Sequence, residues 1–155
     1  MRIRLTSQTQ KDHACQVIQG LPDGKKVIKI LDDKDIRSNA QNSLYWVWVT
    51  QLAGEQGLTK DEVHHYLKEK FLVRIYERDD PDGYGAMIES IRKVWRSGDK
   101  LTAMSIKDQV VDLTSTTNAE VPQFSEFLDD IDKDSIGKGI YLSRPEDLYR
   151  EAMGQ

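Results

Sequence analysis

At the start of the chain, the hydrophobic pattern predicts a strand, a helix and a second strand. In residues 1–5, apolar and basic side chains alternate, which is typical of a short strand with one basic face. Ser7 and Gln10 have the spacing of a capping box, and the apolar residues after them recur at helical intervals, so we predict a helix over residues 8–20. Residues 25–31 are apolar and β-branched, which predicts another strand after a turn.

A longer helix is predicted in the middle of the chain, after an acidic turn and the polar segment 37–42. Ser38 and Asn39 are suitable caps, and the residues after them predict a helix over 39–54. Its apolar residues form two stripes: Leu44, Val47, Trp48 and Leu52 in one, and Tyr45, Val49 and Ala53 with Trp46 in the other. A helix that is apolar nearly all round is buried on more than one side. In so short a chain the second stripe indicates a subunit interface, and we expect a homodimer.

The next segment contains a second helix start and a loop. Thr59 and Glu62 form a capping box in front of a helix predicted over 60–71. Residues 73–76 fit either a short strand or an extended loop. Residues 79–85 are rich in Asp, Pro and Gly, which predicts the most flexible loop of the chain.

The last half of the chain continues to mix helical and strand patterns. Apolar spacing predicts a helix over 87–95, and residues 109–113 fit another strand. Pro122 suits the first turn of a further helix, and Pro145 precedes a short final one. The apolar face of the helix at Pro122 would be Val121, Phe124, Phe127, Leu128 and Ile131. We therefore expect the α+β class, with a small mixed sheet and several helices.

The composition fits a soluble protein made of one domain, residues 1–155. A single cysteine, Cys15, excludes a disulfide framework and a multi-cysteine metal site. The chain shows no signal sequence and no apolar run near the ~20 residues of a membrane span, so we expect a cytoplasmic protein. Residues 1–107 carry 18 basic and 15 acidic side chains, whereas residues 108–155 carry 4 and 11. An acidic C-terminal third suits a nucleic-acid-binding or protein-binding module, or simply a well-solvated surface.

Two groups of residues offer metal-binding chemistry. His64 and His65 are adjacent and would point about 100° apart on a helix, so Glu62 and His65 form the better pair. Three carboxylates of the loop at 79–85 could chelate Mg²⁺ as in a nuclease, although a polar loop needs such residues anyway. They are Asp79, Asp80 and Asp82. Neither group is a complete ligand set, so we expect no metal, no cofactor and no enzymatic activity.

The polar segment before the central helix offers a different chemistry. Gln41 and Asn42 would lie near a helix N-terminus, where free backbone N–H groups and the helix dipole attract anions. Lys34 and Arg37 add positive charge just before them. The segment therefore predicts a phosphate site. The alternative is ordinary capping of the helix, with the amides bonding the loop.

The sequence RSNAQNSLYW, together with TKDEVHHYLKEKF, resembles the NinB family of phage recombination proteins. The family pattern is Arg-Ser, then Gln-Asn, then an aromatic residue, which correspond here to Arg37, Ser38, Gln41, Asn42 and Trp46. A second block has a Ser-Thr-Ser/Thr run before a helix with an early Phe, matched by residues 115–117 and Phe124. The resemblance covers most of residues 1–131.

The resemblance implies an intertwined α+β homodimer that binds single-stranded DNA, contacts single-stranded-DNA-binding protein and assists recombinase loading. The DNA-binding residues that we predict are Lys34, Arg37, Ser38, Gln41, Asn42 and Trp46, and Tyr45 is a second candidate for base stacking. One departure is the segment 118–120, Asn-Ala-Glu, where a DNA-binding relative would be expected to turn basic. Two alternatives stay open: a metal-dependent nuclease, and an adaptor whose acidic region 108–155 binds a basic partner.

Overall fold

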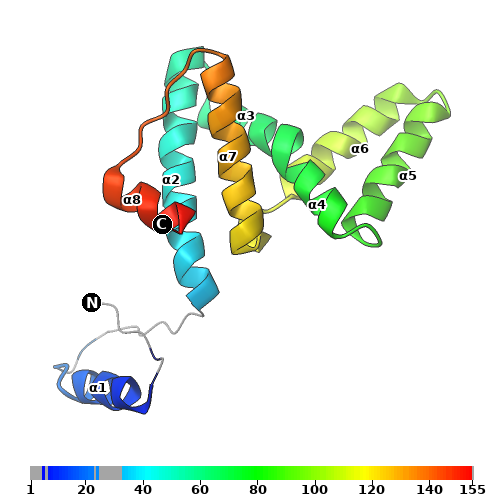
Figure 1. The fold of residues 1–155 in the computed structure, drawn as a ribbon. Helices are drawn as coiled ribbons and strands as arrows, with labels where there is room; N and C mark the ends of the chain where they lie inside the picture. Colours follow the sequence, from blue (N-terminus) through cyan, green and yellow to red (C-terminus); the bar gives the residue numbers. More distant parts are fainter. Residues whose placement is uncertain (1–4, 6, 23, 25–32, 155) are drawn as a thin grey trace. The chain divides into compact units, whose positions relative to one another are not determined.

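The computed structural model describes residue 5, residues 7–22, residue 24 and residues 33–154, of which 33–38 by backbone alone. The chain divides into two compact units, Met1–Ile36 and Arg37–Gln155. The helices among the described residues, in chain order, are α1 (Gln8–Gln19), α2 (Asp33–Gln56), α3 (Lys60–Leu67), the π-helical turn η1 (Lys68–Leu72), α4 (Val73–Asp79), α5 (Tyr84–Arg96), α6 (Lys100–Leu113), the 3-10 turn η2 (Thr116–Asn118), α7 (Val121–Gly137) and α8 (Glu146–Met153) (Figure 1).

Every regular element among the described residues is helical, and the predicted α+β class with a mixed sheet is wrong. Residues 73–76, which fit a short strand or an extended loop, lie in α4, and the strand predicted at 109–113 is the end of α6. A short apolar run fits a buried strand or one face of a helix equally well. Here Ile75 and Val111 are buried on helix faces, so tertiary packing overrides the β-propensity of both runs.

The helix predicted near the N-terminus is confirmed as α1. Its cap is Ser7, whose hydroxyl accepts a hydrogen bond from the backbone N–H of Gln10 over 3.3 Å. None of the residues of α1 is buried. The strands predicted on either side, residues 1–5 and 25–31, lie outside the described residues apart from residue 5.

The central helix, α2, begins at Asp33 rather than near residue 39. The acidic turn and the polar segment predicted in front of it are its own first turns. Neither contains Gly or Pro, and acidic residues suit a helix N-terminus. Ser38 and Asn39 are therefore inside the helix, and the prediction that they cap it is wrong.

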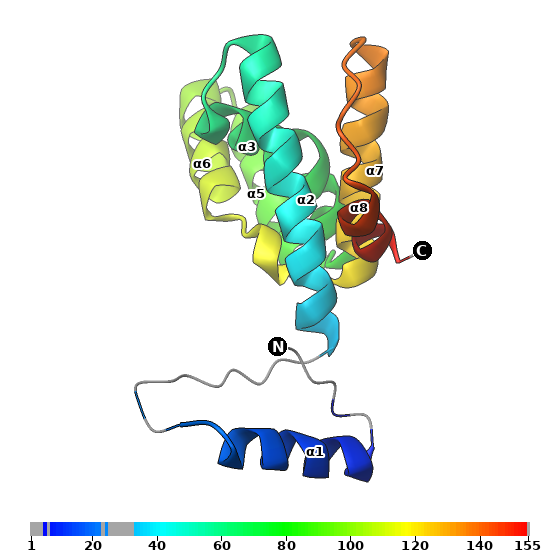
Figure 2. The ribbon, with the colours of Figure 1, turned by 90° about the vertical axis from the view of Figure 1, so that its left-hand side faces the viewer.

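Most residues of both apolar stripes of α2 are buried within this chain, and the exceptions are Trp46 and Val47, which are exposed. The core side chains of α2 are Leu44, Tyr45, Trp48, Val49, Leu52 and Ala53. They pack with Phe127 and Leu128 of α7, with Leu67 of α3 and with residues of α4 and α8. Figure 2 shows α2 between α3 on one side and α7 and α8 on the other. The second stripe thus has partners in the same chain, which removes the argument that it forms a subunit interface.

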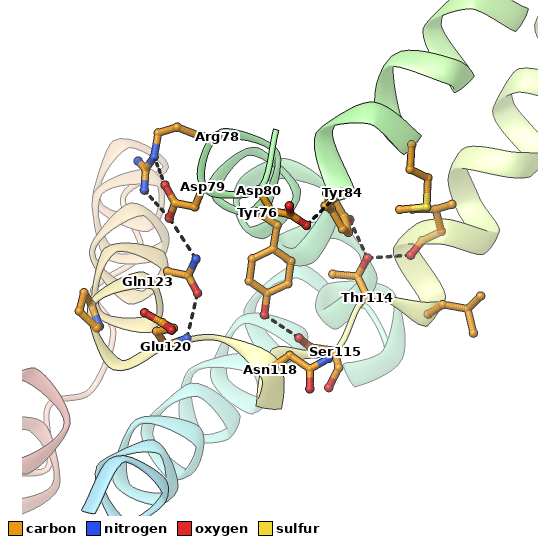
Figure 3. A pocket seen from close by; sticks show the side chains of 14 residues that line it. Tyr76, Arg78, Asp79, Asp80, Tyr84, Thr114, Ser115, Asn118, Glu120 and Gln123 are labelled. Carbon is orange, nitrogen blue, oxygen red and sulfur yellow. Dashed lines mark hydrogen bonds and ion pairs between the residues drawn. The ribbon is translucent and has the colours of Figure 1, made fainter. Parts of the chain in front are cut away.

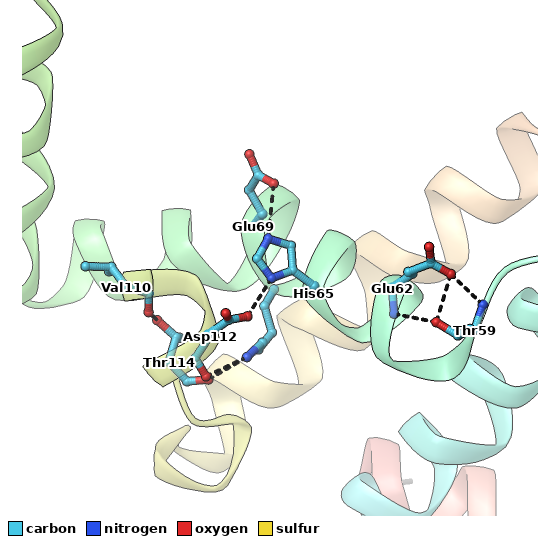
Figure 4. A network of polar contacts seen from close by, with 8 residues as sticks. Thr59, Glu62, His65, Glu69, Val110, Asp112 and Thr114 are labelled. Carbon is cyan, nitrogen blue, oxygen red and sulfur yellow. Dashed lines mark hydrogen bonds and ion pairs between the residues drawn. The ribbon is translucent and has the colours of Figure 1, made fainter. Parts of the chain in front are cut away.

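A π-helical turn joins α3 to α4, so the helix predicted to end near 71 continues to Asp79. The predicted capping box is confirmed: the N–H of Thr59 donates to Glu62, and the N–H of Glu62 donates to the Thr59 hydroxyl. In the π turn, the buried Lys68 ammonium donates to the backbone carbonyls of Asp112 and Thr114 over 3.1 and 3.2 Å (Figure 4). Burial lowers the pKa of Lys68, while carbonyls at a helix C-terminus favour a cation. The hydrogen bonds of Lys68 therefore connect the π turn to the C-terminal end of α6.

The helices α5 and α6 form a hairpin with a small core of its own, made by Ile88, Ile91 and Ala103. The flexible loop predicted at 79–85 is only the turn 80–83 between α4 and α5. The Asp80 carboxylate accepts hydrogen bonds from the backbone N–H groups of Gly83 and Tyr84, at 3.0 and 2.8 Å. No helix in the described part of the chain is long and apolar enough to cross a membrane.

Candidate functional site

Gln41, a predicted phosphate ligand, is fully buried between α2 and α7. Its amide nitrogen donates to the Val121 carbonyl over 3.1 Å and to the Ser125 hydroxyl over 2.9 Å. Because α2 begins at Asp33, Gln41 lies in the third turn of the helix, away from free backbone N–H groups. In this conformation it cannot reach a phosphate, so its role is structural.

The other residues of the Arg-Ser and Gln-Asn motif are less fully described. Asn42 is half-buried, and its side-chain oxygen has no hydrogen-bond partner among the described residues. Lys34, Arg37 and Ser38 lie in the first two turns of α2, and their side chains fall outside the description. The predicted DNA contacts of these residues stay predictions.

Trp46 is the predicted DNA-binding residue that the structure places at the surface. Its side chain is 37% exposed. The indole stacks on the imidazole of His64, with ring centroids 4.9 Å apart and an angle of 27° between the planes. It also meets Tyr45 edge to face at 5.5 Å. Tyr45, the second candidate for base stacking, is fully buried, so that suggestion is wrong.

The buried Tyr45 contacts the His64 ring and fixes its orientation. Burial raises the pKa of the Tyr45 phenol, and burial together with the Lys68 charge lowers the pKa of His64. Both groups are therefore uncharged at neutral pH. The Tyr45 phenol and Nδ1 of the imidazole share a hydrogen bond of 2.7 Å. Trp46 thus rests on a neutral aromatic support whose orientation is fixed by the core.

The exposed side of α2 around Trp46 carries uncharged polar side chains. Asn39, Ser43 and Thr50 lie at helical intervals from Trp46 and are exposed. The hydroxyls of Ser43 and Thr50 donate to backbone carbonyls one turn earlier, each over 2.8 Å. This side of the helix therefore presents one aromatic surface among small hydrogen-bonding groups.

The two metal-binding suggestions find no support in the geometry. His65 donates from Nδ1 to Asp112 over 2.8 Å, and its other ring nitrogen is 3.9 Å from Glu69 (Figure 4). Glu62 is occupied by the capping box with Thr59. Within the described part of the chain, no group of three or more His, Cys, Asp or Glu side chains is arranged to hold a metal ion.

Two of the three aspartates named for the nuclease alternative, Asp79 and Asp80, make hydrogen bonds within the chain. The Asp79 carboxylate accepts from the Arg78 guanidinium at 2.7 and 3.0 Å and from the Gln123 amide at 3.0 Å. These bonds hold the pKa of Asp79 at about 2. Asp80 caps α5, and its carboxylate points into the turn. Among the described residues, these aspartates are not part of any group of three or more side chains arranged to hold a metal ion.

Sequence reasoning missed a cleft of about 1040 Å³ that is lined by residues from α4 through the start of α7 (Figure 3). One wall is apolar, with Met87 of α5 and Leu113 of α6. Figure 3 shows the network of Arg78, Asp79 and Gln123 on the side of the cleft away from Tyr84 and Thr114. The lining residues come from five separate segments with no common spacing. The two sequence signals at this place were the Asp-rich turn and the Ser-Thr-Thr run.

The second block of the family pattern has a structural role. Ser115 accepts a hydrogen bond from the N–H of Thr117, which starts η2, and Glu120 caps α7 with Gln123. Phe124 lies in the core at the start of α7, as the pattern implies. The segment therefore builds a helix entry, and the acidic side chain of Glu120 faces the cleft.

In comparisons with protein-family models, curated proteins and solved structures, nothing matches this chain. The resemblance to the NinB family thus rests on the motif residues alone.

Proposed function

We propose that this protein binds single-stranded DNA and acts as a phage-type recombination mediator without catalysing a reaction. As the motif implies, it would contact single-stranded-DNA-binding protein and assist recombinase loading in the host cytoplasm, as a homodimer. The observation that supports this proposal is the exposed Trp46 indole, stacked on His64 within a polar strip of α2.

Trp46 has the features of a base-stacking residue. A base that stacks on an aromatic side chain in a single-strand-binding protein contributes about 1–3 kcal/mol, largely irrespective of sequence. His64 fills one side of the indole and fixes its orientation, which lowers the entropy lost on binding. Asn39 and Ser43 are exposed next to it and are suited to base edges and sugar oxygens.

Arg37, on the same helix as Trp46, offers positive charge to the phosphates. It precedes Trp46 by nine residues, which is about 14 Å along a helix axis. A strand lying along α2 would then meet Arg37 first and the aromatic surface second. Gln41 has no part in this proposal, because it is buried against α7.

The test compares two exposed tryptophans by DNA-binding affinity. Trp46→Ala should weaken binding of a fluorescently labelled oligothymidine by about 5- to 150-fold, the scale of one lost stacking contact. Trp95→Ala is the matched control, because Trp95 is 45% exposed on α5 and belongs to none of the motifs. Its affinity should match that of the wild type.

Two results would contradict the proposal. One is the absence of single-strand binding by the wild-type protein at low salt. The other is an equal loss of affinity in both tryptophan variants. Melting curves for each variant separate lost contacts from lost folding.

A further inference from the structure

Two apolar side chains that line the cleft are exposed to solvent. Leu113, the last residue of α6, is 84% exposed, and Met87 of α5 is 39% exposed. Val110 lies one turn before Leu113 and lines the same cleft. Val110 is half-buried and packs against the small hairpin core of Ile88, Ile91 and Ala103, whereas Met87 and Leu113 are exposed. Neighbouring exposed apolar side chains that line one concave surface mark an interaction site more often than scattered ones do.

The charged lining of the cleft is mainly acidic. Among the charged lining residues are three carboxylates, Asp79, Asp80 and Glu120, and one guanidinium, that of Arg78. Arg78 is bound by Asp79 and by Glu126 of α7, at 2.7 Å to each. Its charge is therefore already matched, and the cleft as a whole is negative.

The floor of the cleft is held by hydrogen bonds from two tyrosines. The Tyr76 phenol donates to the Ser115 carbonyl over 2.8 Å, and the Tyr84 phenol pairs with the Thr114 hydroxyl at 2.7 Å (Figure 3). Burial raises the pKa of Tyr76 to about 12, so this phenol keeps its proton. A floor fixed in this way gives the cleft its shape before any ligand arrives, which reduces the cost of binding.

We propose that this cleft is a docking site for a partner-protein segment that carries an apolar side chain next to a lysine or arginine. The apolar side chain would lie against Met87, Val110 and Leu113, and the cation would be attracted by the net negative charge of the cleft lining. A volume of about 1040 Å³ is at the upper end of what small-molecule pockets have, and suits several side chains of a peptide. The negative charge disfavours DNA, so this surface serves a function separate from the strand binding proposed for α2.

The experiment uses two fluorescent peptides and the full chain. Both peptides are short and have leucines at helical spacing; one carries lysines between them and the other glutamates. The lysine peptide should bind saturably, and added salt should weaken it. The glutamate peptide should bind at least about tenfold more weakly, since like charges across an interface are strongly disfavoured.

Two leucine variants on α6 distinguish the cleft from general attraction to an acidic protein. Leu113→Ser should weaken the lysine peptide by about tenfold, the loss expected on removing an apolar anchor. Leu101→Ser is the control, because Leu101 is 82% exposed at the other end of α6 and does not line the cleft. It should bind like the wild type. Both positions are so exposed that neither change should alter the melting temperature.

Glu120→Gln supplies the electrostatic arm of the test. It should weaken the lysine peptide and reduce its salt dependence, while single-strand DNA binding is unchanged. The proposal is overturned if the lysine peptide does not saturate, if both peptides bind equally, or if the two leucine variants lose affinity alike. Displacement of the lysine peptide by single-stranded DNA would also overturn it, because the two ligands would then share one surface.

Discussion

Replacing Gln41 by alanine should destabilise the fold and leave DNA binding intact. The change removes two hydrogen bonds to α7, at 3.1 and 2.9 Å, from a fully buried position. Two such bonds contribute about 1–3 kcal/mol together. The lost methylenes add about 1–2 kcal/mol through the unfilled space. Removing the Gln41 side-chain oxygen stabilises the fold by roughly 1 kcal/mol, because a buried acceptor without a donor destabilises it.

The free energy of unfolding should therefore fall by about 1–4 kcal/mol, measured by urea unfolding. For a chain of this length, the melting temperature should fall by about 2–16 °C. Thr50→Ala, on the exposed side of the same helix, is the control and should stay within about 0.5 kcal/mol of the wild type. At a temperature where Gln41→Ala is fully folded, the affinity of this variant for single-stranded DNA should equal that of the wild type. A Gln41→Ala protein with wild-type stability and weak DNA binding would refute this reasoning and return Gln41 to the DNA surface.

Three further predictions concern charge and assembly. Arg37→Ala should weaken single-strand binding by about 1–3 kcal/mol. In titrations at several salt concentrations, the slope of the logarithm of the binding constant against the logarithm of the salt concentration should become shallower by ~0.7. An unchanged slope in a folded variant would show that Arg37 does not contact the DNA. Burial lowers the pKa of His64, so below pH 6.5 the unfolded chain binds a proton at this residue more readily than the folded chain does. The free energy of unfolding should therefore drop as the pH falls below 6.5. His64→Gln should remove that part of the pH dependence, and a variant with the same profile as the wild type would contradict the assignment. Light scattering should give a mass of twice 17.8 kDa for the homodimer, and a mass of one chain at micromolar concentration would contradict it.

The helices that begin with a local signal were predictable from the sequence. The Ser7 cap and the capping box of Thr59 and Glu62 each involve residues within three positions of one another. Such contacts form in any context that allows a helix. Pro122 in the first turn of α7 is a signal of the same kind.

The elements that depend on distant contacts were not predictable. Residues 73–76 have strand-like composition, and their helical state follows from the burial of Ile75 beneath α2 and α7 residues of the core. The role of Gln41 depends on where α2 begins and on Val121, a residue eighty positions later. The cleft is assembled from separate segments, so its residues have no periodic or motif signal.

The central claim, that bases stack on Trp46, is tested most directly by tryptophan fluorescence. The chain has three tryptophans, of which Trp48 is buried in the core. Trp46→Phe and Trp95→Phe each keep an aromatic ring and remove one exposed indole. If bases stack on Trp46, saturating single-stranded DNA quenches the emission of the wild type and of Trp95→Phe, and leaves that of Trp46→Phe nearly unchanged. Quenching that persists in Trp46→Phe and disappears in Trp95→Phe would contradict the claim and move the DNA to the α5–α6 hairpin.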